Sequence, residues 1–202
     1  MKTQQIITGV LLAIGAAFAI HKAMQPDLGL LEFKVKDTRA YGNGYTDDRS
    51  VGIIKKLVKD NPQVDTLVLK RMSGTRDSTR NVLIARNIRK NQLDTHLEKN
   101  SQIASGAVDL FLAGKRRTME CGALIGVHSW SISGSMDHIR ISPKDIGYDR
   151  SQKYHEDFLS DMGIDPAFYA FTRAAAEPED IHYMSVEEIN RFGLTSEPLD
   201  CG

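Results

Sequence analysis

The stretch that decides the fold reads Ile103-Ala-Ser-Gly-Ala-Val-Asp-Leu-Phe-Leu-Ala-Gly-Lys-Arg-Arg117, with Ala123-Leu-Ile-Gly-Val-His-Ser129 shortly after it. Ser105 stands where the pattern predicts that a strand gives way to an apolar helix ending near Leu112. His128 stands at the end of the next predicted strand. Because neighbouring parallel strands end at the same edge of a sheet, we expect the two side chains to meet there.

The pairing of Ser105 with His128 has the chemistry of an activated nucleophile. A serine hydroxyl is inert until an adjacent base takes its proton. A hydroxyl at a helix start also lies near free backbone N–H groups that can stabilise an oxyanion, and Gly106 leaves room for a substrate carbonyl. Each residue also has a purely structural interpretation. Ser105 would then belong to a tightly packed helix start, and His128 would be a half-exposed histidine at a strand end.

Outward from this stretch, strands and helices alternate, which is typical of βαβ units around a parallel sheet. Hydrophobic periodicity predicts, in chain order, a strand at Gly29 to Lys36, a loop at Arg39 to Asp48, a helix at Ser50 to Lys59, a strand at Val64 to Leu69, a helix at Ser78 to Asn91 and a strand at Thr95 to Glu98.

The chain beyond Pro143 is predicted to be helical. Amphipathic segments span Tyr148 to Met162 and Pro166 to Ala176. Ser185 is predicted to cap a short helix with acids in its first turn, and Gly193 is predicted to end it. No linker separates these helices from the rest, so we expect one domain.

The two blocks around Ser105 and His128 resemble those of the ClpP peptidases, and still more those of exported ClpP-like bacterial proteins. On this resemblance Ser105 matches the nucleophile and His128 the general base, 23 residues later. Residues 184–194 resemble the closing segment of that family, so the likeness covers about Val64 to Thr195. It implies an α/β fold of the ClpP/crotonase type, a spiral of ββα units with a mostly parallel sheet and a helical C-terminal part.

The resemblance also implies an oxyanion hole, made by the backbone N–H groups of Gly74 and Gly106, and departs from the family at three points. A Gly-Gly turn is expected where this chain has Thr75-Arg76, next to Gly74; non-glycine residues there restrict positive φ and crowd the substrate path. Exported relatives have Ser-Ala-Cys where this chain has Ser-Gly-Ala. The third catalytic residue aligns with Ile181, so either Asp180 beside it completes a triad or the site is a Ser–His dyad.

The leading hypothesis is therefore a ClpP-like serine hydrolase, most concretely a peptidase, that acts on a peptide or protein substrate and needs no metal or organic cofactor. The alternative is a catalytically inactive ClpP-fold binding or scaffold protein. A third hypothesis is acyl-thioester chemistry of the crotonase type. The resemblance further implies a homo-oligomer.

Composition excludes few functions. The chain has 202 residues, and its Lys+Arg and Asp+Glu counts are equal, at 26 each. A nucleic-acid-binding protein usually carries a basic stripe, so we expect no nucleic-acid partner. We find neither a CxxC motif nor a His/Cys cluster with metal-ligand spacing, so no metal site is predicted.

The N-terminus and the two cysteines bear on localisation. The apolar stretch from Ile6 to Ile20 predicts a signal peptide or N-terminal membrane anchor over residues 1–22, followed by a ClpP/crotonase-like domain over residues 27–202. We therefore expect a periplasmic or other extracytoplasmic protein, either released or anchored to the inner membrane; the alternative is a buried helix of a cytosolic protein. In an oxidising compartment Cys121 and Cys201 could pair, or they are two unrelated thiols.

Overall fold

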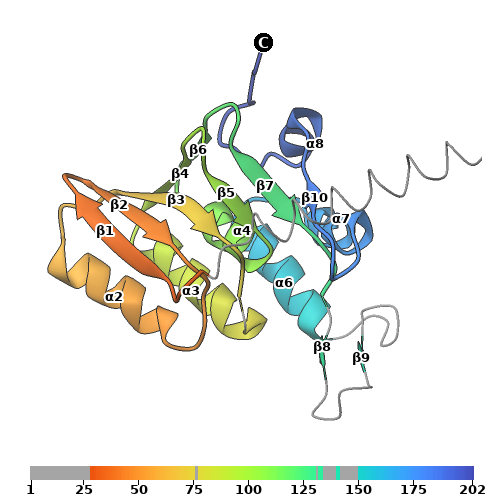
Figure 1. The fold of residues 1–202 in the computed structure, drawn as a ribbon, viewed down its shortest axis with the longest axis horizontal. Helices are drawn as coiled ribbons and strands as arrows, with labels where there is room; N and C mark the ends of the chain where they lie inside the picture. Colours follow the sequence, from red (N-terminus) through yellow and green to blue (C-terminus); the bar gives the residue numbers. More distant parts are fainter. Residues whose placement is uncertain (1–27, 76, 131, 134–139, 142–149) are drawn as a thin grey trace, which may run out of the picture.

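The computed structural model describes residues 28–75, 77–130, 132–133, 140–141 and 150–202. Its main feature is a sheet with the strand order β1-β2-β3-β5-β7-β10, from which β4 and β6 branch at β3 (Figure 1). The strands of this sheet are β1 (Glu32–Lys36), β2 (Arg39–Asn43), β3 (Thr66–Met72), β4 (Asp94–Leu97), β5 (Gln102–Ala104), β6 (Arg117–Met119), β7 (Leu124–Val127) and β10 (His182–Tyr183).

The interior of this sheet is parallel and its two ends are antiparallel. The pairs β2/β3, β3/β4, β3/β5, β4/β6 and β5/β7 are parallel, whereas β1/β2 and β7/β10 are antiparallel. A separate antiparallel pair consists of β8 (Ile132–Ser133) and β9 (Arg140–Ile141). The mixed α/β fold with a mostly parallel sheet confirms the predicted class.

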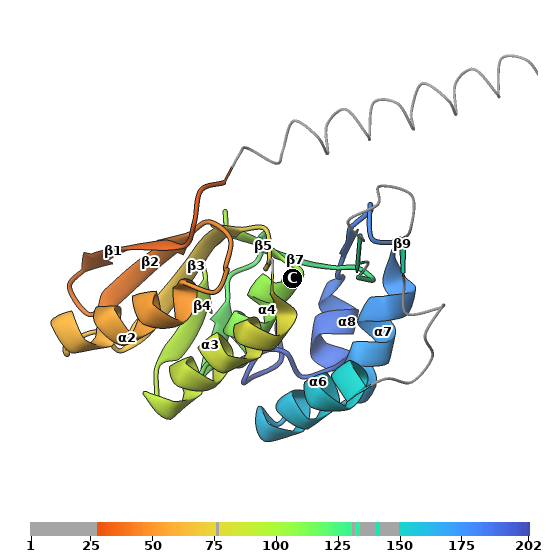
Figure 2. The same ribbon diagram turned by 90° about the horizontal axis from the view of Figure 1, so that it is seen from below.

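The helices bury the apolar sides of the strands. They are α2 (Ser50–Asp60), α3 (Ser78–Lys90), α4 (Gly106–Leu112), α6 (Arg150–Asp161), α7 (Ala167–Ala175) and α8 (Val186–Arg191). Figure 2 shows α2, α3 and α4 side by side along one face of the sheet, and α3 contacts both of the others. Their inward residues, among them Ile54, Ile88 and Phe111, are fully buried, so this packing holds the start of α4 firmly against the sheet.

One predicted loop is a strand, and this prediction was wrong. Arg39 to Asn43 forms β2, although its Gly and Asn residues favour turns. It pairs with β1 on one side and β3 on the other, and these ladders outweigh its weak intrinsic strand propensity. Gly42 lies under the Phe33 ring, where an added Cβ would come within 2.7 Å of a ring carbon. Tertiary pairing thus makes a strand of a sequence that local preference marks as a loop.

The C-terminal part is fixed by polar contacts and a disulfide. Ser185 caps α8 in a capping box with Glu188, as predicted, and Gly193 follows the helix with φ of 60°. A disulfide joins Cys121 to Cys201, with the two Cα atoms 5.6 Å apart. This resolves the question that the sequence left open and ties the chain end to the turn before β7.

The predicted signal peptide or membrane anchor over residues 1–22 lies outside the described residues. Within the part of the chain that is described, no helix is long and apolar enough to span a membrane.

Candidate active site

Ser105 lies at the strand-to-helix turn between β5 and α4, as the sequence predicts. Its backbone has φ of 55° and ψ of −132°, a conformation that a non-glycine residue rarely adopts. The Ser105 N–H donates to the Gly126 carbonyl at 3.0 Å, and the Ser105 carbonyl accepts from the Val108 N–H at 2.9 Å. Both contacts hold the residue in a strained turn, and strained backbone of this kind clusters at functional sites.

Gly74 lies against the Ser105 side chain. It follows β3 with φ of +119°, and a Cβ built there would be 2.8 Å from the Ser105 Cβ and 3.2 Å from its hydroxyl oxygen. Only glycine combines that backbone conformation with so close an approach. Gly74 therefore takes the positive φ of this turn, and Thr75 does not need one; Arg76 lies outside the described residues.

Gly106 is required for packing, because the space on its Cβ side is filled by neighbouring side chains. A Cβ at this position would lie 2.5 Å from the Thr75 methyl carbon and 2.9 Å from the Asn81 side-chain nitrogen. Gly106 is the first residue of α4, and the N–H groups at a helix start have no partner within the helix.

His128 follows β7 directly, on the strand next to that of Ser105. The parallel register pairs Ala104 with Gly126, so Ser105 and His128 lie just beyond the same edge of the sheet. Among the described residues no hydrogen bond joins the Ser105 hydroxyl to the His128 ring. Hydrogen bonds of this kind are often long in unliganded enzymes and tighten when substrate binds.

The His128 ring has its tautomer set by the main chain. Nδ1 lies 2.5 Å from the Ser129 carbonyl oxygen. Because a carbonyl oxygen only accepts, Nδ1 carries the proton and the neutral ring keeps Nε2 free of one. Burial lowers the pKa of His128, against a smaller opposite effect of that hydrogen bond. Because the effect of burial is the larger, the ring favours its neutral form, in which Nε2 can accept a proton.

Asp180, the predicted third member, is not brought to His128. It is exposed, and its N–H donates to Glu177 in a turn. The antiparallel pairing of β10 with β7 sets His182 opposite Val127. Extended by one residue, this register sets Ile181, rather than Asp180, opposite His128. The Nδ1 atom that an acid would engage lies against the Ser129 carbonyl oxygen instead, and among the described residues no hydrogen bond joins Asp180 to the His128 ring.

Three polar residues behind the turn were not predicted: Thr46, Asn81 and Asp109. Asn81 is fully buried and donates to Asp109 Oδ2 at 2.8 Å. Desolvation raises the pKa of Asp109 to about 6, while the charge of His155 and the Asn81 hydrogen bond act in the opposite direction. The sequence does contain a signal for a buried Asn81, since the helical spacing of positions 81, 85 and 88 sets it on the same inward face as Ala85 and Ile88.

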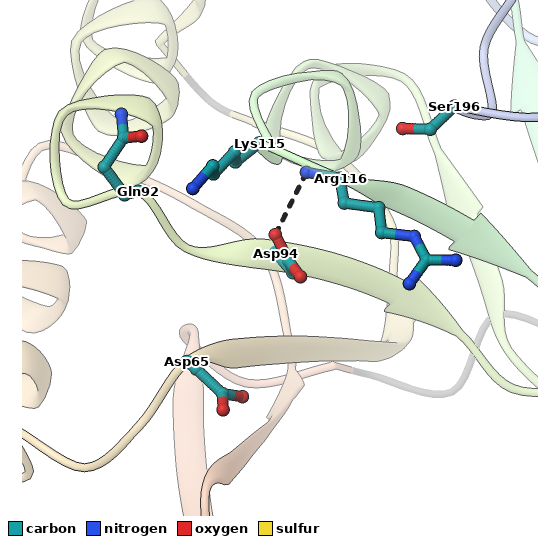
Figure 3. A pocket seen from close by; sticks show the side chains of 6 residues that line it. All are labelled: Asp65, Gln92, Asp94, Lys115, Arg116 and Ser196. Atoms are coloured by element: carbon teal, nitrogen blue, oxygen red, sulfur yellow. Dashed lines mark hydrogen bonds between the residues drawn. The ribbon is translucent and has the colours of Figure 1, made fainter.

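A shallow pocket lies at the opposite edge of the sheet (Figure 3). Asp94 begins β4 and Arg116 directly precedes β6, with the Arg116 N–H donating to Asp94 Oδ1 at 3.0 Å. These are the amino ends of parallel strands, whereas ligands of open α/β sheets bind beyond the carboxyl ends, where Ser105 lies. The pocket is therefore not part of the candidate site; its lining consists of Asp65, Gln92, Asp94, Lys115, Arg116 and Ser196.

No protein-family model matches the chain, and neither does any curated protein. Solved structures do match. An enoyl-CoA hydratase/isomerase family member has 15% identity and a TM-score of 0.51 over 85% of this chain and 70% of its own. A serine-to-alanine mutant of the membrane-bound stomatin-specific protease 1510-N has 12% identity and a TM-score of 0.49, with 80% and 79% coverage.

A third similar structure is an enoyl-CoA hydratase from Polaromonas sp. JS666, with 10% identity and a TM-score of 0.46 over 83% of this chain and 70% of its own. At such identities the likeness concerns the fold alone. Together with the strand order described above, it shows that this chain has the mixed α/β fold of ClpP/crotonase-like proteins.

Proposed function

We propose that this protein is a serine hydrolase, most concretely a peptidase, with Ser105 as nucleophile and His128 as general base. The observation that carries the proposal is the Ser105 backbone, which takes φ of 55° at a strand-to-helix turn directly against the positive-φ Gly74. Serine hydrolases on other α/β folds expose their nucleophile on a strained turn of this kind. A structural serine has no need of that strain, which costs about 1–3 kcal/mol.

The proposed reaction begins when His128 Nε2 takes the Ser105 hydroxyl proton as the oxygen attacks an amide carbonyl. The Gly74 and Gly106 N–H groups donate to the resulting oxyanion. The protonated His128 then gives its proton to the leaving amine, and an acyl ester remains on Ser105. Attack by water, again with His128 as base, releases the acid and restores the serine.

In this reaction the Ser129 carbonyl supplies the orientation that a carboxylate supplies in a triad. It holds Nδ1–H and so keeps Nε2 available as the base. A carbonyl carries no full charge and stabilises an imidazolium less than a carboxylate does. We therefore expect a slower enzyme than one with a complete triad. Asp180 takes no part in the proposed reaction.

We further propose that the protein acts outside the cytoplasm and binds flexible peptide segments. The disulfide between Cys121 and Cys201 supports that location, because such bonds persist in oxidising compartments and are rare in the cytosol. The apolar stretch from Ile6 to Ile20 supports export, either with cleavage or as an anchor. Separation of periplasmic, membrane and cytosolic fractions of expressing cells tests this part by itself.

Labelling with a fluorophosphonate tests the proposed chemistry. We expect a single adduct on the 202-residue chain, located on the peptide that contains Ser105 and absent from Ser105→Ala. Ser101→Ala is the matched control: Ser101 lies just before the same strand but is buried, whereas Ser105 is partly exposed, so the adduct should persist in this variant. A folded wild-type chain that takes no adduct would favour the non-catalytic binding protein instead.

A further inference from the structure

Asn81 is a buried amide that connects three segments of the candidate site from behind. It lies in the first turns of α3 and is 0% exposed. Its Nδ2 donates to the Gly106 carbonyl at 2.7 Å and to Asp109 Oδ2 at 2.8 Å, and its Oδ1 accepts from the Thr46 hydroxyl at 2.8 Å. Both hydrogens of the amide group are used; two of the partners, Gly106 and Asp109, belong to α4, and Thr46 lies between β2 and α2.

The orientation of this amide follows from its partners. The Gly106 carbonyl and the ionised Asp109 carboxylate only accept, so the nitrogen must face them. The opposite end then faces the Thr46 hydroxyl, which can donate. Because a reversed amide would set its oxygen against two acceptors, a single orientation satisfies all three contacts.

Thr46 carries the connection to the Gly74 turn. Its N–H donates to the Gly74 carbonyl at 2.9 Å, and its hydroxyl lies 3.3 Å from that same oxygen. Thr46 is fully buried, like Asn81. Gly74 is thus joined to Gly106 through two side chains, in the order Gly74, Thr46, Asn81 and Gly106.

The connection matters because an oxyanion hole works only when its donors are fixed before the substrate arrives. Productive geometry tolerates about 0.5 Å, and donors must be held by supporting contacts to stay within it. Gly74 lies in the turn after β3 and Gly106 begins α4, and the two share no backbone hydrogen bond in the described chain. Asn81 and Thr46 supply a hydrogen-bonded link between them, in addition to the packing of Gly74 on Ser105 and of Thr75 on Gly106.

We propose that Asn81 is a positioning residue for the hydrolase: with Thr46 it holds the Gly74 and Gly106 donors at a fixed separation around Ser105. This inference rests on the proposed function. Asn81 touches neither the nucleophile nor the base, so its removal should slow the chemical step and leave probe affinity nearly unchanged.

The test measures the rate of fluorophosphonate labelling against probe concentration, which separates the maximal rate constant from the half-saturating concentration. Asn81→Asp keeps the shape of the side chain and removes both donated hydrogens, and we expect the maximal rate constant to fall about 100-fold. Asn87→Asp makes the same change on the same helix, where the amide donates only to Leu83 of its own helix. We expect this control to label at the wild-type rate.

Thr46 provides a second, gentler pair of variants. Thr46→Val keeps the branched shape and the backbone N–H and removes only the hydroxyl, whereas Thr46→Ser keeps the hydroxyl. We expect Thr46→Val to lower the maximal rate constant about tenfold and Thr46→Ser to restore most of it, with half-saturating concentrations within about threefold of wild type. Thermal melting identifies any variant that fails to fold; if Asn81→Asp is one, the Thr46 pair decides.

The outcomes separate the two proposals. Wild-type labelling with slow Thr46→Val and Asn81→Asp and a fast Asn87→Asp supports the inference. Wild-type labelling with folded Thr46→Val and Asn81→Asp at the wild-type rate overturns the inference and leaves the hydrolase standing. A folded wild-type chain without any label overturns the proposed function and this inference with it.

Discussion

Gly74 leaves no room for a side chain against Ser105, because a methyl group at position 74 would come within 2.8 Å of the serine Cβ. The contact joins the turn after β3 to the turn after β5, two strands that are neighbours in the sheet. It explains how the one glycine left in this turn still allows a nucleophile and a backbone donor to approach each other. The next residue, Thr75, serves instead to pack against Gly106.

Replacing Gly74 therefore tests the contact. Gly74→Ala forces a Cβ into Ser105 at a positive φ, and we expect a loss of about 1–3 kcal/mol in the free energy of unfolding. We also expect labelling of Ser105 to slow about 100-fold. Gly52→Ala is the control, since its Cβ would meet nothing within 4 Å on helix α2; it should be neutral or slightly stabilising. Equal effects of the two changes in urea unfolding would contradict the account.

Strain at Ser105 predicts an inverted order of stability. At an ordinary position alanine is more stable than glycine by about 0.5–1 kcal/mol, because glycine loses more chain entropy on folding. At φ of 55° the order should reverse, with Ser105→Gly about 1 kcal/mol more stable than Ser105→Ala. The same pair at Ser101, which has no positive φ, should show the ordinary order. An alanine variant more stable than glycine at both positions would mean that Ser105 is unstrained.

The pH dependence of labelling reports on His128. Burial lowers its pKa below the ordinary value of 6.5. Only the neutral ring can take the serine proton, so the labelling rate should be constant near neutral pH and fall as the pH drops through the lowered pKa. The profile is measured with the wild-type chain from acidic to neutral pH. A midpoint above 6.5 would indicate a charged partner that stabilises the imidazolium, such as Asp180 in a triad.

The disulfide is expected to stabilise the fold without touching the chemistry. It closes a loop over a sequence separation of 80 between the turn before β7 and the chain end. Replacing both cysteines with serine should lower the free energy of unfolding by about 2–4 kcal/mol. The labelling rate of Ser105 should stay the same, since Cys121 lies before β7 whereas His128 follows the other end of that strand. A large loss of labelling in the folded double variant would show that the tail supports the site.

The sequence allowed most of the fold to be predicted because its helices and buried strands are periodic. Helix α2 begins and helix α3 begins at the residues that the pattern indicates. Strand β2 could not be found in this way. Its extended conformation depends on pairing with β1 and β3, whereas its Gly and Asn residues disfavour a strand. The short β6 and β10 were also missed, because two or three residues are too few for a period to show.

For the candidate site, the sequence predicts the placement of those residues that directly follow a strand. Ser105 and His128 follow adjacent strands, and that order is visible in the sequence. The contacts of Asn81 with Thr46 and with Asp109 join positions 35 and 28 residues apart, respectively, so no local pattern contains them. The position of Asp180 depends on the register of β10 against β7, which a resemblance in short motifs does not determine.

The most direct test of the central claim is the rate at which a fluorophosphonate labels Ser105 in the wild-type chain and in His128→Ala. A general base contributes about 10²- to 10⁴-fold, so we predict that removal of the imidazole slows labelling by at least that lower figure while the chain stays folded. Ser105→Ala should take no label at all. Equal rates for the wild type and His128→Ala, or a label that persists in Ser105→Ala, would contradict the assignment of these two residues as nucleophile and base.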